Sequence, residues 1–491
     1  MGIIARQTLK SSTVGYLAAV VGILNAFFIY TLCFDAAELG RFRYVQEAGL
    51  VLAGFFSLGI TNVIVRFFPD FKDDKSKHHG FLGFIVLVLL GGIIIFLGLY
   101  GITYQWWPSE FQDNFWYIFL LFVAIMFTNS FYYYSSNFRL ITIPNLFRQL
   151  WVKVGLGICA LIYFYFNLSF DSVLYSVVLV YIVAAFGVIF YLYIKRNFSL
   201  NLEFNYFTKD RIRNIAVFAG FGLLSSLGSS LATRLDIFMV TDMLSFSKTG
   251  VYSIAMSITG LMVLVTFPML SVSGPIIAES LVKNDIQHVH SIYKKSSLNL
   301  FLFGALLLLL IWVNIDSIFQ IIPNGERYAE GKIVILILGL AKLVDMVTSV
   351  NEVIIGYSKH FKFNLYALLL LGLLNILANL FFIPLFNIAG AAFATFLSIV
   401  LFNIAKTTFI FKKFAIHPFQ KSLVYILLMS LMLFFIVHYL VHINDPYMAI
   451  FIKSILVLGV YVVVCLRINI SEDVTLFWTN TKNKIFDIIK R

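Results

Sequence analysis

Residues 80–104 read GFLGFIVLVLLGGIIIFLGLYGITY and contain no charged side chain. A helix needs about 20 predominantly apolar residues to cross the hydrocarbon core of a bilayer, so this run is long enough to cross once. It lacks the alternation of apolar and polar residues that marks a membrane β-strand, and we therefore predict a transmembrane helix. Similar runs recur along the whole chain and predict about 14 spans, at 11–33, 45–65, 80–104, 114–135, 145–167, 172–194, 214–235, 250–274, 297–315, 332–356, 363–383, 386–409, 422–441 and 447–466.

The composition supports the same fold class. Hydrophobic residues make up 60% of the 491 residues and charged residues 12%, whereas a soluble domain carries roughly a quarter charged residues. The sequence therefore predicts an all-α polytopic membrane protein with little chain left for a soluble catalytic domain. Cys33, Cys159 and Cys465 lie far apart and predict neither a disulfide nor a metal site.

The distribution of positive charge predicts the topology. Most of the 36 Lys and Arg residues fall in alternate loops, and this pattern places those loops and both termini in the cytoplasm. The same pattern explains the net charge of +12 without a nucleic-acid partner. The opposite side holds few cations: Arg41, Arg43, Arg234, Lys248, Arg327 and Lys332.

A basic inner loop divides the predicted spans into two halves. We expect an N-terminal six-helix bundle at 1–195, a cytoplasmic linker at 196–213 and a C-terminal six-helix bundle at 214–413. Two additional helices follow at 414–470, and a cytoplasmic amphipathic tail is predicted at 471–491. The halves share a short pattern, since Glu38-Leu-Gly-Arg-Phe precedes the second span and Lys248-Thr-Gly-Val-Tyr precedes the eighth. Repeated halves are a common way to build transporters.

With these features, and with Arg234-Leu-Asp-Ile-Phe-Met-Val ahead of Gly250-Val-Tyr-Ser-Ile-Ala-Met, the chain resembles the Wzx-type polysaccharide biosynthesis flippases that export O-antigen and capsule units. These belong to a superfamily with the multidrug MATE exporters and the lipid II flippases. The resemblance implies a V-shaped pair of six-helix bundles around a central cavity. It also implies a cargo, an undecaprenyl-pyrophosphate-linked oligosaccharide, that is moved from the inner to the outer leaflet by alternating access.

Charged residues inside the spans are candidates for the site, because a charge at mid-bilayer costs about 2.5–3.5 kcal/mol on insertion scales. The tenth span carries Lys342, Asp345 and Glu352. Asp345 and Glu352 are seven residues apart and share a helix face, so we expect a polar stripe along the cavity. Either carboxylate is a candidate for a coupling ion, H+ or Na+. The alternative is local, with Lys342 and Asp345 paired at i,i+3 and Glu352 snorkelling.

Arg234 and Asp236 lie near the outer end of the seventh span, and we expect Arg234 to contact a pyrophosphate or an anionic sugar. Interfacial anchoring is the alternative, with Asp236 paired to Arg41 or Lys248. Lys153, in the fifth span, either snorkels to the interface or receives the lipid-linked pyrophosphate.

Asn375 and Asn379, one turn apart in the eleventh span, either join helices by hydrogen bonds or contact sugar hydroxyls. No cofactor or metal site is predicted.

We therefore expect a non-enzymatic flippase in the bacterial inner membrane. Its expected partners are the polyprenyl-pyrophosphate-linked glycan, membrane lipids and a glycan polymerase or other assembly proteins. A MATE-type drug or cation antiporter, which would favour a carboxylate-rich cavity, and a lipid II flippase remain alternatives. A membrane glycan polymerase or ligase would require a long outer loop, and the predicted outer loops are short.

Overall fold

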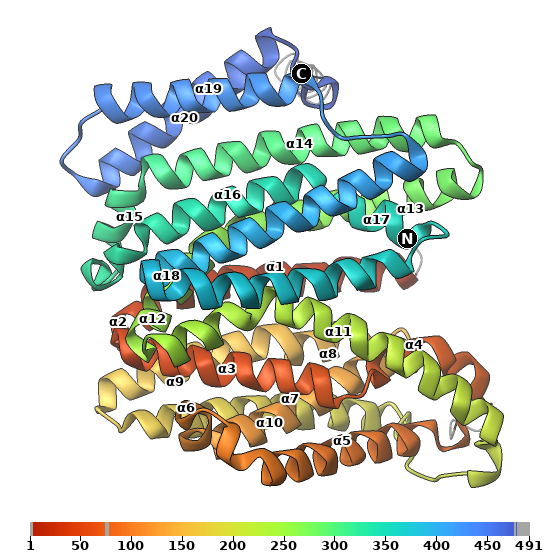
Figure 1. Ribbon diagram of the computed structural model, residues 1–491. Helices are drawn as coiled ribbons and strands as arrows, with labels where there is room; N and C mark the ends of the chain where they lie inside the picture. The colour runs from red at the N-terminus through yellow and green to blue at the C-terminus, as the bar shows by residue number, and fades with distance from the viewer. Residues whose placement is uncertain (1–2, 74–77, 476–477, 479–491) are drawn as a thin grey trace, which may run out of the picture. The chain divides into compact units, whose positions relative to one another are not determined.

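The computed structural model describes residues 3–73, 78–475 and 478 (Figure 1). The chain forms two compact units, Met1–Ile254 and Ala255–Arg491, called here the first and the second unit. The described residues form helices and no strand, so the all-α prediction is confirmed. Of the predicted tail at 471–491, only residues 471–475 and 478 are among those described.

The first unit is built from helices that follow most of the predicted spans, although the span predicted at 45–65 is divided between α3 and α4. Helix α1 continues into a π-helical segment, and α9 follows another one. Its elements are α1 (Ile3–Leu24), the π-helix η1 (Asn25–Ile29), α2 (Tyr30–Cys33), α3 (Ala36–Phe56), α4 (Ile60–Phe71), η2 (His78–Gly80), α5 (Phe81–Thr103), η3 (Tyr104–Trp106), α6 (Ser109–Asp113), α7 (Phe115–Ser136), α8 (Thr142–Asn145), the π-helix η4 (Leu146–Trp151), α9 (Val152–Phe166), α10 (Phe170–Ile194), η5 (Phe204–Tyr206), α11 (Lys209–Met243) and the start of α12 (Phe246–Gly260).

A capping box fixes the start of α3. The Asp35 carboxylate accepts from the Glu38 amide at 2.7 Å, and the Glu38 carboxylate accepts from the Asp35 amide at 3.0 Å. This reciprocal arrangement satisfies backbone donors that the first helical turn leaves open. Glu38 also accepts from the Tyr163 hydroxyl of α9 at 2.5 Å. This hydrogen bond ties the start of α3 to α9.

Helix α11 belongs to the first unit, where it lies beside α3 and α4 (Figure 1). Helices α11 and α4 approach closely at Gly222, where a Cβ would lie 2.6 Å from the side-chain nitrogen Nδ2 of Asn62. The boundary between the units thus falls within α12, whereas the prediction placed it at the 196–213 linker and assigned α11 to the C-terminal bundle. Loop length and charge located the linker but carry no information about the helices on which α11 packs.

The second unit contains three long helices that run side by side, α14, α16 and α18 (Figure 1). After the end of α12, its elements are η6 (Leu261–Val265), α13 (Thr266–Val282), α14 (Ile286–Val313), α15 (Ile315–Ile321), η7 (Gly325–Gly331), α16 (Lys332–Thr348), α17 (Val350–Tyr357), α18 (Lys362–Phe414), α19 (Lys421–Leu440) and α20 (Pro446–Arg467).

Helix α18 bends at Asn387, whose φ of 52° and ψ of −135° lie outside the helical region. Pro384 precedes the bend and removes a backbone donor from the helix. The two arms match the separate spans predicted at 363–383 and 386–409.

By length and composition, ten described helices can cross a membrane, or up to twelve if each of two bent pairs counts as one span. The bent pairs are α3 with α4, at 42°, and the helix ending at Thr348 with α17, at 41°. The prediction of a multi-pass membrane protein is confirmed, while the number 14 stays a prediction. Part of the difference is that α18, with 53 residues, is counted once although it is about twice the length of a span.

Candidate functional site

Arg43, two turns into α3, is a cation in apolar surroundings. Its guanidinium lies 5.6 Å from the centre of the Tyr30 ring, and its Nε is buried without a hydrogen-bond partner. Among the residues that the structure describes, no carboxylate lies within ion-pair distance of Arg43. A guanidinium in these surroundings has N–H donors available to bind an anionic ligand.

Lys153 is the second cation of this region and lies within electrostatic range of Arg43. It stands in the first turn of α9, directly after the π-helical segment η4. Its side chain crosses α1 at Gly22, where a Cβ would lie 2.9 Å from the Lys153 Nζ. In the described part of the chain, no carboxylate pairs with Lys153 either. Two cations that repel each other are therefore held near one another, and no described carboxylate forms an ion pair with either.

The Asn25 side chain fixes the backbone at Lys153. Its Nδ2 donates to the Lys153 carbonyl oxygen at 2.6 Å and to the Tyr30 hydroxyl at 3.3 Å, and its side chain is buried. Asn25 begins the π-helical segment η1, and Lys153 lies two residues after the end of η4, so this hydrogen bond joins the two helices beside their π-helical turns. Such turns are rare and occur frequently at functional sites. We define Arg43, Lys153, Asn25 and Tyr30 as the cationic cluster of the first unit.

Sequence reasoning had placed Lys153 among the candidates and missed Arg43. Arg43 was counted with the outer-side loop cations, because it lies before the predicted start of the second span at residue 45. The structure begins that helix at Ala36. The available signal was the Asp35-x-x-Glu38 capping box, which marks a helix start and places Arg43 well inside α3.

Arg234 is paired within the first unit. Its guanidinium forms an ion pair with the Glu47 carboxylate of α3. Asp236 is buried, and its Oδ2 accepts from the Tyr252 hydroxyl of α12 at 2.8 Å. Of the two partners predicted for Asp236, Arg41 instead forms an ion pair with Asp171 at 3.1 Å.

The shared glycine pattern has a structural reason. Gly40 of α3 and Gly250 of α12 face each other so closely that a Cβ on Gly40 would overlap the Phe246 carbonyl oxygen, and one on Gly250 the Ala36 carbonyl oxygen. Only a residue without a side chain permits the two backbones to meet in this way. The two copies of the pattern therefore pack against each other.

In the second unit, the polar residues of the tenth predicted span turn toward α18. Asp345 Oδ1 accepts from the Asn403 amide at 3.4 Å, and Glu352 Oε2 lies 3.9 Å from the Nζ of Lys406. Lys406 is only 2% exposed, and its ammonium lies 4.2 Å from the centre of the Phe402 ring. The local alternative, an ion pair between Lys342 and Asp345, is absent from the described residues.

Asn375 and Asn379 are both buried and joined to each other. The Asn379 amide donates to Asn375 Oδ1 at 2.9 Å, and the Asn375 amide donates to the Thr395 hydroxyl at 3.1 Å. Thr395 lies on the other arm of α18, so the network spans the bend at Asn387. The two asparagines therefore take part in hydrogen bonds that join the two arms of α18.

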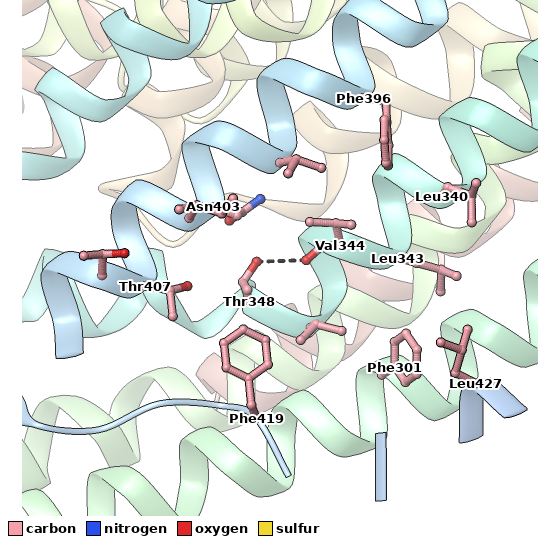
Figure 2. Close-up of a pocket in the computed structure, with 14 residues that line it drawn as sticks. Phe301, Leu340, Leu343, Val344, Thr348, Phe396, Asn403, Thr407, Phe419 and Leu427 are labelled. Carbon is pink, nitrogen blue, oxygen red and sulfur yellow. Dashed lines mark hydrogen bonds between the residues drawn. The ribbon is translucent and has the colours of Figure 1, made fainter. Parts of the chain in front are cut away.

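A cavity of about 450 Å³ lies between α14, α16, α18 and α19 of the second unit (Figure 2). Its wall is almost entirely apolar, with Phe301, Phe396 and Phe419 among the lining residues. Figure 2 shows Asn403 and Thr407 on α18 and Thr348 on α16, and these supply the polar edge. The Thr348 hydroxyl donates to the Val344 carbonyl oxygen at 2.9 Å.

Comparison with solved structures places the fold among lipid and drug transporters. The chain is similar to the lipid II flippase MurJ in an inward closed conformation, with a TM-score of 0.72, 14% identity and coverage of 94% of this chain and 99% of that one. It is also similar to an inward-facing multidrug MATE transporter of the MOP superfamily, with a TM-score of 0.60, 15% identity and coverage of 82% and 94%. At these identities the likeness shows the fold.

Comparison of sequences is more specific. A Salmonella typhi protein named "Putative O-antigen transporter" is 23% identical over 303 residues, which cover 59% of this chain and 69% of the relative. Residues 222–381 match the MatE family. Residues 4–281, more than half of the chain, match the family described as polysaccharide biosynthesis protein. The chain therefore belongs to the polysaccharide biosynthesis protein family.

Proposed function

We propose that the protein is a flippase that moves an undecaprenyl-pyrophosphate-linked oligosaccharide from the inner to the outer leaflet of the bacterial cytoplasmic membrane by alternating access. Membership of the polysaccharide biosynthesis family and the similarity to an O-antigen transporter support this proposal. The observation that carries it is the pair of cations, Arg43 and Lys153, for which the described residues of the first unit provide no carboxylate partner.

The chemistry of the cargo fits this pair. A pyrophosphate presents several anionic oxygens, which a guanidinium binds with two parallel hydrogen bonds and an ammonium binds as a point charge. Since a charge in hydrocarbon costs about 2.5–3.5 kcal/mol, unpaired cations are retained where a ligand or water compensates for them. The polyprenyl tail would remain in the lipid while the glycan passes through the protein.

The remaining features of the proposal are its topology, partners and energy source. Both termini lie in the cytoplasm, on the side where positive charge accumulates. The cargo is handed on to a glycan polymerase or other assembly proteins, and no nucleic acid is involved. Transport uses an H+ or Na+ gradient or the downstream consumption of the cargo. The protein acts as a transporter and catalyses no covalent step.

A MATE-type exporter of cationic drugs is a weaker account of the same structure. A cationic ligand would be repelled by Arg43 and Lys153, and the carboxylates of the tenth predicted span already face Lys406. A lipid II flippase would use the same pyrophosphate chemistry, so it differs from our proposal only in the glycan.

Ligand-dependent stabilisation of the purified protein tests the proposal. A ligand that binds only the folded state raises Tm according to its concentration relative to Kd. We expect undecaprenyl pyrophosphate to raise Tm by several degrees, and neither undecaprenol nor ethidium to do so. Stabilisation by ethidium with no response to the pyrophosphate would favour the drug exporter and contradict the proposal.

Export in cells then separates the two flippases. In a strain that lacks the gene, re-expression should restore surface polysaccharide, while the peptidoglycan precursor pool should not change. Failure to restore the polysaccharide, together with rescue of a strain depleted of its lipid II flippase, would assign the chain to lipid II.

A further inference from the structure

Resting on the proposed function, we infer that Lys406 is a tethered counter-ion that fills the space between Asp345 and Glu352 and closes this carboxylate pair to a metal cation. The two carboxylates are the groups that the sequence suggests as coupling-ion ligands. The inference therefore names Lys406 as the residue that determines which ion this part of the second unit accepts.

The position of Lys406 is unlike that of a snorkelling lysine. Its side chain is 2% exposed, and its ammonium lies 4.2 Å from the centre of the Phe402 ring and 3.9 Å from Glu352 Oε2. Asp345 is also within electrostatic range. An ammonium withdrawn from water to this extent is stable only near anionic or aromatic partners, and both kinds are present.

The two carboxylates lie on opposite sides of a break in the helix. Asp345 is in the last turn of α16 and Glu352 in the first turn of α17, and the axes of these helices differ by 41° at the Thr348–Val350 junction. Lys406, on α18, lies 3.9 Å from Glu352 on one side of this break and within electrostatic range of Asp345 on the other. Its ammonium thus lies near two carboxylates that would share one face if the helix were straight.

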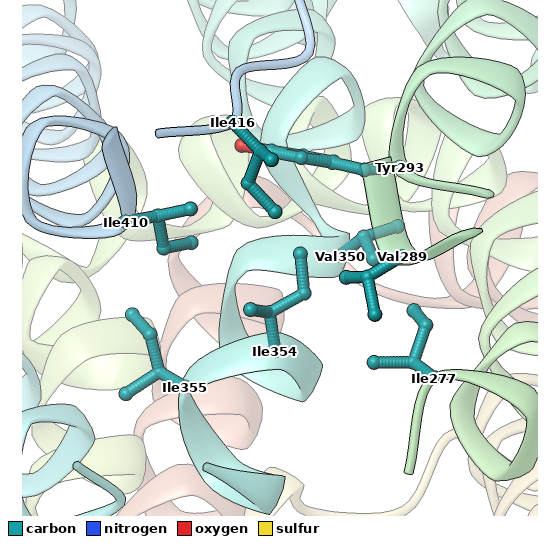
Figure 3. Packing of buried hydrophobic residues seen from close by; sticks show 8 residues of the cluster. All are labelled: Ile277, Val289, Tyr293, Val350, Ile354, Ile355, Ile410 and Ile416. Atoms are coloured by element: carbon teal, nitrogen blue, oxygen red, sulfur yellow. The ribbon is translucent and has the colours of Figure 1, made fainter. Parts of the chain in front are cut away.

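One side of the break is held firmly by packing. Val350, Ile354 and Ile355 of α17 are fully buried in a cluster with residues of α13, α14 and α18 (Figure 3). Asn351 adds polar contacts, because its amide donates to the Thr407 hydroxyl at 2.9 Å and its Oδ1 accepts from the Tyr293 hydroxyl. Since α17 is fixed against α18, the Lys406 ammonium is presented to Asp345 and Glu352 at a defined place.

The Lys406 ammonium offsets one of the two carboxylate charges next to it, and water reaches the Glu352 side chain, which is 62% exposed. The charged groups that bear on Lys406 are Asp345 from α16 and Glu352 from α17, while α14 contributes the neutral Tyr293 and the amide of Asn403 lies against Asp345. A Na+ ion coordinated by the two carboxylates would lie close to the ammonium and be repelled by it. Replacing Lys406 by an uncharged side chain should therefore open a cation site.

Thermal unfolding of the purified full chain in detergent tests this inference, with NaCl compared with choline chloride at the same ionic strength. We expect Lys406→Met to gain a Na+-specific rise in Tm of about 2 °C or more beyond any rise in the wild type. Lys406→Arg, which keeps the charge, should respond to Na+ as the wild type does. The gain should vanish in Lys406→Met/Asp345→Asn.

Two results would overturn the inference. One is a Na+ response of Lys406→Met equal to that of the wild type. The other is a loss of the Na+ response in Asp345→Asn with Lys406 intact, which would mean that Asp345 binds Na+ in the native protein. We expect the Na+ response of this variant to match that of the wild type. The variant also provides a test if Lys406→Met does not fold. No lipid-linked glycan enters this assay, so its failure leaves the flippase proposal standing, and the absence of pyrophosphate binding would leave the inference standing.

Discussion

The two units differ in the partners that they give to positive charges within their helices: Arg43 and Lys153 are half-buried, and Lys406 is buried. In the first unit, Arg43 and Lys153 stand near each other with aromatic and amide neighbours and, among the described residues, no carboxylate. In the second unit, the buried Lys406 lies against an aromatic ring, 3.9 Å from the Glu352 carboxylate and within electrostatic range of Asp345. Both arrangements lie in helices that are apolar along most of their length, so the medium does not explain the difference. We infer that the first unit reserves its charge for an external anion and the second unit neutralises its charge internally.

The largest expected effect is on export. Arg43→Gln and Lys153→Gln should each lower surface polysaccharide about 10- to 100-fold at unchanged protein level, since hydrogen bonds to charged groups contribute about 1.5–3 kcal/mol. Quantitative blotting of the polysaccharide measures this. Lys453→Gln on α20, which removes another half-buried cation, serves as the matched control and should export normally. Normal export by both first-unit variants would remove the basis for the comparison.

The second effect concerns stability. Glu47→Gln leaves Arg234 without its partner and should lower the free energy of unfolding by about 2–3 kcal/mol, because a partly buried charge becomes uncompensated. Arg43→Gln removes a charge for which no described carboxylate forms an ion pair, and it should cause no such loss. Denaturant unfolding in mixed micelles distinguishes them, and the double variant Glu47→Gln/Arg234→Gln should recover part of the loss. Equal destabilisation by Glu47→Gln and Arg43→Gln would show that Arg43 has an internal partner.

A smaller effect is expected from the residue that positions the cationic cluster. Asn25→Ala removes the hydrogen bonds to the Lys153 carbonyl oxygen and to Tyr30, and should cost about 1–2 kcal/mol of stability. Export should fall less than in Lys153→Gln, because the charge itself remains. Measuring Tm and export together tests this, and an Asn25→Ala protein with unaltered Tm would show that the amide does not position α9.

The smallest effect is expected for an exposed ion pair. Lys283 donates to Glu279 at 2.5 Å and thereby lowers the pKa of the Glu279 carboxyl. Stability from a lowered carboxyl pKa is present above the ordinary value and is lost as the pH falls through the lowered one. Both groups are exposed at the end of α13, so water and salt screen the pair. The Tm of Glu279→Gln should therefore follow that of the wild type from pH 8 to pH 4, and a divergence at low pH would show that exposed pairs also stabilise this protein.

The fold was largely predictable because a membrane imposes a simple rule on sequence. Each long apolar run became helical, although those at 45–65 and 332–356 are divided between two helices at a bend, and the run at 214–235 lies within α11. The assignment of α11 to a unit was not predictable, since it depends on contacts such as that between Gly222 and Asn62. Periodicity along one helix carries no information about which neighbour that helix meets.

The site was predictable in residue type and only partly in role. Because charged residues are rare in the spans, Lys153, Arg234, Asp345 and Glu352 could be identified as candidate site residues. It could not show that Arg234 is paired with Glu47, because the partners lie on α11 and α3, far apart in the sequence. Lys406 carries no signal in the sequence that separates it from the nearby Lys412 and Lys413, and only the packing of α18 against α16 and α17 reveals that it is buried.

The binding affinity for the bare lipid carrier tests the central claim most directly. The Kd of undecaprenyl pyrophosphate should be measured for the wild type and for Arg43→Gln/Lys153→Gln, with undecaprenol as the reference for tail contacts. We predict that the double variant binds the pyrophosphate at least about tenfold more weakly and binds undecaprenol as the wild type does. Equal affinity of the two proteins for the pyrophosphate would contradict the claim that the unpaired cations of the first unit bind the anionic end of the cargo.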